Sequence, residues 1–124
     1  MAVETRGIRH VHLLVRDLPH SVAFYESVFG MTVALRDGKI LFLRSPSGGD
    51  DLALHQASTA DEKARVGQPG GFEHFGITVT DRSRLDEAIA AVEAAGGALV
   101  QRGEHEPGVP YAYIRDPDGY VIEI

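Results

Sequence analysis

The chain has 124 residues, 44% hydrophobic and 24% charged, which suits one globular domain that folds without disulfides or structural metal. Its formal net charge of -6 opposes nucleic-acid binding, which requires clustered Lys and Arg. Cysteine is absent, so any metal must be bound by His, Asp or Glu. Because no apolar run could span a bilayer and no signal-peptide core is visible, we expect a cytoplasmic protein without nucleic-acid or membrane partners.

The first half of the chain reads as a strand, a helix and three further strands. Asp17 is suited to cap the helix at its start, and Gly30 is suited to end it in the left-handed conformation. Asp37-Gly38 is a typical two-residue hairpin turn. The predicted elements are a strand at 8–15, a helix between Asp17 and Gly30, and strands near 31–36, 39–44 and 51–56.

The second half repeats this order after a polar connector, 57–71, whose middle could be helical. Its predicted elements are a strand at 73–80, a helix that begins after Asp81 and ends at Gly96-Gly97, and strands near 97–101, 110–115 and 120–124. Asp17 follows His10 by seven residues, and Asp81 follows His74 by seven. We therefore predict an α+β fold of paired βαβββ modules, residues 7–57 and 71–124, within a single domain covering 1–124.

Duplication also predicts a metal site. His10 and His74 hold equivalent places on the first strand of each module, and Glu123 lies on the last strand. If the two halves form a common concavity, they supply two imidazoles and one carboxylate and leave coordination positions open, as a catalytic metal requires. Any one of these residues alone is more often an ordinary surface side chain, so the prediction depends on the set. Such a set accepts Fe(II), Mn(II), Ni(II), Co(II) or Zn(II).

Three segments carry a family resemblance: RHVHLLVRDL at 9–18, HFGITV at 74–79 and DPDGYVIE at 116–123. The chain resembles the vicinal oxygen chelate superfamily, which includes glyoxalase I, extradiol dioxygenases, fosfomycin-resistance enzymes and bleomycin-binding proteins. The resemblance implies curved mixed sheets around a metal pocket. It also implies a metal-dependent enzyme, dioxygenase-like or a glyoxalase-like lyase or isomerase, whose small substrate chelates the metal through neighbouring oxygens. The alternative is a metal-free, bleomycin-resistance-like protein that sequesters an antibiotic.

The sequence departs from glyoxalase I at one ligand. Where that enzyme has a fourth ligand, the repeat places Ala53, which cannot coordinate a metal. His55 lies two residues further on the same strand face, and it could be a displaced ligand, a pocket base or a rim residue bonded to water. His12 lies on the face of His10 and is a candidate acid or base, or else a packed neighbour of the first ligand.

Tyr113 precedes Glu123 by ten residues, the separation at which related dioxygenases and fosfomycin enzymes carry a pocket tyrosine. Its hydroxyl could bond a metal-bound oxygen, although an aromatic residue there could also be ordinary core. Short relatives of this superfamily commonly share the site between chains. The resemblance therefore implies a homodimer in which one protomer provides His10 and the other provides His74 and Glu123.

Overall fold

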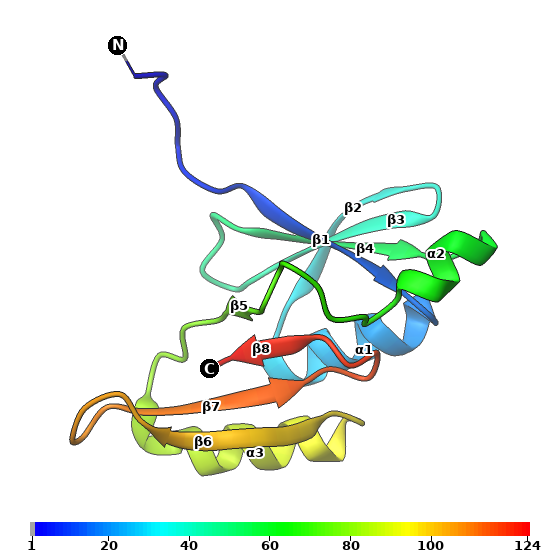
Figure 1. Cartoon of the computed structure of the whole chain (residues 1–124). Coiled ribbons are helices and arrows are strands. Elements are labelled where there is room, and N and C mark those ends of the chain that lie inside the picture. The colour runs from blue at the N-terminus through cyan, green and yellow to red at the C-terminus, as the bar shows by residue number, and fades with distance from the viewer. Residues whose placement is uncertain (1) are drawn as a thin grey trace.

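A computed structural model describes residues 2–124, which form two four-stranded sheets, each with a helix packed against one face (Figure 1). The first sheet and its helix comprise β1 (His10–Val15), α1 (Leu18–Phe29), β2 (Thr32–Asp37), β3 (Ile40–Arg44) and β4 (Asp51–Gln56). The second half comprises β5 (Phe75–Gly76), the short 3-10 helix η1 (Arg82–Arg84), α3 (Leu85–Ala94), β6 (Ala98–Glu104), β7 (Pro110–Arg115) and β8 (Val121–Glu123). The connector contains α2 (Ala60–Arg65).

The two sheets have the same topology. Their strand orders are β1-β4-β3-β2 and β5-β8-β7-β6, and in each sheet the first and last strands of the module pair in parallel while the other pairs are antiparallel. This confirms the predicted α+β class and the paired βαβββ plan. The division into modules 7–57 and 71–124 within one domain, 1–124, stays a prediction.

Local capping explains where the first helix begins and ends. The side chain of Asp17 accepts a hydrogen bond from the backbone N–H of His20, and Pro19 occupies the first turn, where its missing N–H costs nothing. At the other end Gly30 adopts φ 65°, a left-handed conformation that glycine reaches without steric penalty. The predicted limits of this helix are therefore confirmed.

Two local predictions were wrong. Asp37 pairs with Ile40, so the hairpin turn is Gly38-Lys39 and lies one residue later than expected, with Gly38 at φ 59°. The strand predicted at 73–80 is reduced to β5. Within residues 2–124 it pairs with the three-residue β8 alone, and the ladder ends where the N–H of Ile77 bonds the carbonyl of Glu123. The residues after Ile77 have no ladder partner in this part of the chain, so they do not continue the strand.

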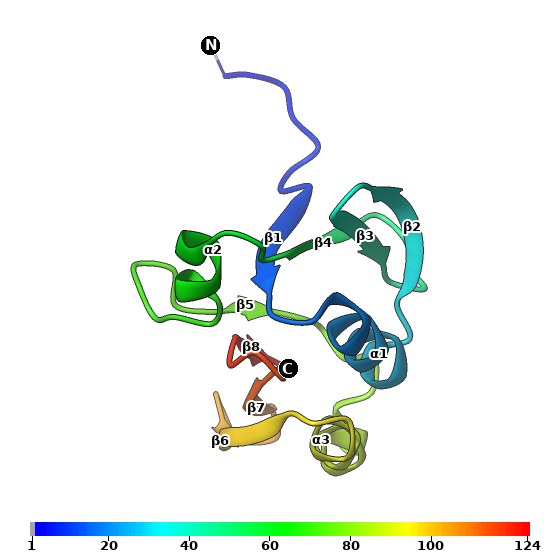
Figure 2. The ribbon, with the colours of Figure 1, turned by 90° about the vertical axis from the view of Figure 1, so that its right-hand side faces the viewer.

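Each sheet buries one face and leaves the other open. α1 packs on β4, α3 packs on β6 and β7, and the two helices contact each other, an arrangement that Figure 2 shows from the side. Side chains alternate accordingly, since Leu41 and Leu43 of β3 are fully buried whereas Ile40 and Phe42 are only partly buried. No helix in residues 2–124 is both long and apolar enough to cross a bilayer.

A buried polar cluster joins the second module to the first. Asp116, only 3% exposed, accepts a hydrogen bond from the Tyr25 hydroxyl at 2.7 Å and from the backbone N–H groups of Asp118 and Tyr120 at 3.0 Å. Asp118 in turn accepts a hydrogen bond from the Ser21 hydroxyl at 3.2 Å. Burial raises the pKa of Asp116 to about 6. The turn before β8 is thereby held against α1.

Replacing Asp116 by Asn should remove a pH dependence of stability. Because the pKa of Asp116 is raised from 3.8 to about 6, the folded protein keeps this proton at pH values where the unfolded chain has lost it. The resulting stabilisation is complete below the unfolded pKa and is lost as the pH rises through the folded one. From pH 4 to 7, the free energy of unfolding of the wild type should fall by roughly 2 kcal/mol relative to that of D116N, measured by urea denaturation. A pH-independent difference would contradict this assignment.

Candidate metal centre

The open face of the first sheet carries three histidines. Leu13 is buried against the helices. Because side chains alternate along a strand, His10 and His12, three residues and one residue before Leu13, lie on the opposite face of β1. Parallel pairing of β1 with β4 sets Leu14 opposite His55, so His55 lies on this open face as well. The structure thus brings His12 and His55 together and leaves His10 exposed beside them.

His12 and His55 belong to a chain of polar contacts that ends on the connector. Their Nε2 and Nδ1 atoms share a hydrogen bond of 3.0 Å, and His55 Nε2 lies 3.2 Å from Glu62 Oε2 without hydrogen-bond alignment. Backbone N–H groups of Thr59 and Ser58 hold the pKa of Glu62 down at about 2, so its carboxylate is ionised. Burial, followed by the charges of His55 and His10, lowers the pKa of His12.

Sequence analysis missed Glu62, although a signal for its position was present. Thr59 and Glu62 have the spacing of a capping box, and both reciprocal hydrogen bonds form at the start of α2.

Ala53, at the position of the absent fourth ligand, pairs with His12 and is fully buried. One ring nitrogen of His55 bonds His12 and the other lies close to Glu62, which is the arrangement of a residue that orients a neighbour.

The open face of the second sheet carries His74, Tyr113 and Glu123. Gly76 and Tyr113 flank Glu123 on the two neighbouring strands, and His74, two residues before Gly76, lies on the same face. His74 Nε2 is 3.2 Å from Glu123 Oε2, while His74 Nδ1 is buried without a hydrogen-bond partner. The Tyr113 ring meets the His74 ring edge-on with centroids 4.9 Å apart. Burial, then the charge of Glu123, raises the pKa of Tyr113, so its hydroxyl stays protonated.

A further histidine, which sequence analysis did not single out, contacts Glu123. His105, in the loop between β6 and β7, places Nε2 2.7 Å from Glu123 Oε1, and its ring stacks on Tyr111 with centroids 4.3 Å apart. The hydrogen bond from His105 is the largest cause of the lowered pKa of Glu123. The sequence pattern predicted a shorter strand near 97–101. The contact with Glu123 depends on β6 extending as far as Glu104, which the structure shows.

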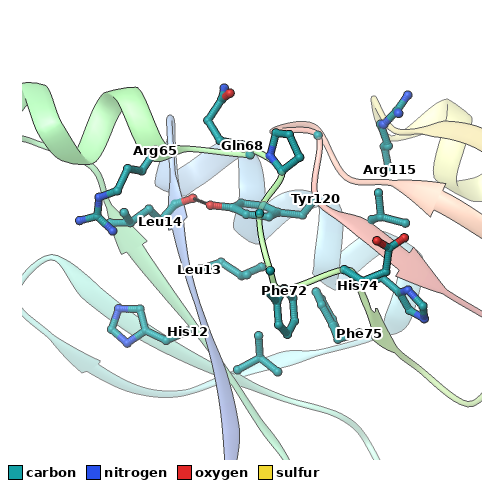
Figure 3. A pocket seen from close by; sticks show the side chains of 18 of the residues that line it. His12, Leu13, Leu14, Arg65, Gln68, Phe72, His74, Phe75, Arg115 and Tyr120 are labelled. Carbon is teal, nitrogen blue, oxygen red and sulfur yellow. Dashed lines mark hydrogen bonds between the residues drawn. The ribbon is translucent and has the colours of Figure 1, made fainter.

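The two sets of residues remain apart within one chain. No group of three His, Asp or Glu side chains that could hold a metal ion forms among residues 2–124, so His10 does not join His74 and Glu123 there. An open cleft of about 1290 Å³ lies between the modules. Figure 3 shows His12 and His74 on opposite sides of it, with Phe72, just after the connector, between them.

Comparison with known proteins places the chain in a family. The sequence profile of the Glyoxalase/Bleomycin resistance protein/Dioxygenase superfamily matches residues 7–124, and the chain belongs to that superfamily. The chain is 31% identical to virulence protein STM3117 of Salmonella typhimurium, over 94% of this chain and 81% of that protein. It is 30% identical to a probable lactoylglutathione lyase of Vibrio parahaemolyticus, over 94% and 88%.

Among solved structures, a glyoxalase-related enzyme from Fulvimarina pelagi superposes with a TM-score of 0.77 at 25% identity, covering 97% of this chain and 87% of that one. The family resemblance and the fold of mixed sheets are thus confirmed, and the metal pocket stays a prediction.

Proposed function

We propose that this protein is a metal-dependent enzyme that holds one divalent cation through His10, His74 and Glu123. Its substrate would be a small molecule that presents neighbouring oxygens to the metal. The observation that carries the proposal is the position of His74 beside Glu123 on the open face of one module, with the repeat-equivalent His10 exposed on the open face of the other.

The donor atoms suit such a cation. The imidazole Nε2 of His74 and a carboxylate oxygen of Glu123 face each other at 3.2 Å, and with a second imidazole they make a set that accepts Fe(II), Mn(II), Ni(II), Co(II) or Zn(II). When bound, the cation would act as a Lewis acid toward substrate oxygens or provide a position for dioxygen. Of the three proposed ligands, His74 and Glu123 lie together within one chain, and His10 would come from a second copy.

Residues around the proposed centre provide proton transfer and orientation. His12, with its pKa lowered, stays neutral over more of the pH range and can accept a proton, while its bond to His55 fixes the direction of the ring. The protonated hydroxyl of Tyr113 can donate a hydrogen bond to a substrate oxygen. A lyase or isomerase reaction would use the proton transfer alone, whereas a dioxygenase reaction would also consume dioxygen, so oxygen uptake separates the two classes.

A second copy of the chain would complete the site. β1 and β5 are outer strands of their sheets with unpaired backbone edges, and apolar side chains stay exposed near them, with Ile8 92% and Phe72 60% exposed. An isologous homodimer would bring the open face carrying His10 to the partner's face carrying His74 and Glu123. It would also cover this apolar surface.

Loss of any proposed ligand should remove most of the metal. We expect His10→Ala, His74→Ala and Glu123→Ala to lose most bound cation when the protein is purified anaerobically, loaded with Mn(II) and assayed by elemental analysis. His55→Ala serves as the matched control and should keep its stoichiometry, because both nitrogens of His55 contact other side chains. Equal metal content in all variants would refute the ligand assignment. A wild type that takes up no cation would favour the metal-free antibiotic-binding alternative.

Mixing two variants that each lack one proposed ligand should restore metal binding if the sites are shared between protomers. In a heterodimer of His10→Ala with Glu123→Ala, one site carries both substitutions and the other carries neither. Random exchange of protomers should therefore recover about one quarter of wild-type metal binding, while each variant alone has little. Sedimentation should show a dimer at micromolar concentration. No recovery after proven exchange would place all three ligands in one chain.

A further inference from the structure

We propose that His105 is a positioning residue for Glu123. It would hold one carboxylate oxygen so that the other stays directed at His74. This inference rests on the proposed role of Glu123 as a metal ligand. His105 is not among the residues that the duplicated pattern predicts. Its loop, between β6 and β7, is longer than the equivalent turn between β2 and β3 in the first module.

Two histidines divide the two oxygens of Glu123 between them. His105 Nε2 lies 2.7 Å from Oε1, and His74 Nε2 lies 3.2 Å from Oε2. The terminal torsion of a glutamate side chain is broad, so the carboxylate of an isolated glutamate samples many orientations. The shorter contact to His105 restricts this rotation and leaves Oε2 as the oxygen that faces His74.

His105 is itself held in place, as a positioning residue must be. Its ring lies nearly parallel to that of Tyr111, with an interplanar angle of 20°. The Tyr111 hydroxyl accepts a hydrogen bond from Gln101 on the neighbouring strand at 3.2 Å. The loop is closed by a hydrogen bond from the backbone N–H of His105 to the carbonyl of Val109 at 3.1 Å. The imidazole is therefore directed at Glu123 before any cation arrives.

The geometry assigns His105 an indirect role. Its side chain is 51% exposed, and it reaches the oxygen of Glu123 that points away from His74. Hydrogen bonds to a ligating carboxylate typically contribute a factor of about 10 to 100 in metal affinity, because they fix the ligand in the orientation that binding requires.

The test is a titration of metal-free protein with Mn(II), in which free Mn(II) is followed by electron paramagnetic resonance. We expect His105→Ala to weaken binding by about 10- to 100-fold with unchanged stoichiometry. His105→Gln, which keeps an N–H donor on a side chain of similar reach, should recover most of the affinity. Tyr111→Leu, which removes the stacked ring, should give a smaller loss. His20→Ala, on α1 and in no contact with Glu123, is the matched histidine control and should bind as the wild type does.

A double-substitution cycle separates positioning from a general effect on the fold. In a Glu123→Ala background, His105→Ala should change the residual affinity little, because the group that it positions is gone. Melting temperatures of all variants report any loss of folding separately.

If Glu123→Ala abolishes binding while His105→Ala binds as the wild type does, this inference fails and the proposed function stands. If Glu123→Ala binds normally, or the wild type binds no Mn(II), the proposed function fails and this inference fails with it. Equal loss of stoichiometry in His105→Ala and His105→Gln would make His105 a ligand and overturn a positioning role.

Discussion

The parallel pairing of the first and last strands of each module determines which side chains meet. In the second module, β5 and β8 adjoin although His74 and Glu123 are 49 residues apart, and the register of this short ladder sets their donor atoms 3.2 Å apart. In the first module, the same pairing joins β1 to β4 and brings His12 to His55. Side chains alternate along each strand, so a slip of one residue in either register would turn these groups into the core.

The same alternation gives each sheet one face for folding and one for chemistry. Apolar residues of the covered faces meet α1 and α3, while the open faces carry the imidazoles together with Tyr113 and Glu123. Asp116 connects the two modules through the buried Tyr25 hydroxyl, just before the strand that ends with Glu123. The position of the proposed ligand relative to the first module is therefore coupled to a polar contact inside the core.

Apart from the exposed His10, each histidine on the open faces has a neighbour that limits its freedom. His12 is bonded to His55, which faces Glu62, and Glu62 is fixed by the cap of a helix in the connector. On the other face, Glu123 lies between two histidines, and one of these stacks on a tyrosine. Rings held in this way would need little reorganisation to take up the proposed roles of metal ligand or proton acceptor, because their orientation is set in advance.

The sequence alone determined the α+β class, the duplicated plan and the cap and stop of the first helix, because apolar period, capping aspartate and terminal glycine act over a few residues. The pairing of His10 with His74 as repeat equivalents came from the same local spacing. Tertiary structure decided the short length of β5, the contacts of Glu62 and His105, and the separation of His10 from Glu123 within one chain. Strand register, the reach of a loop and the placement of two modules involve residues far apart in the chain and leave no local pattern, whereas Glu62 carried the local signal of a capping box.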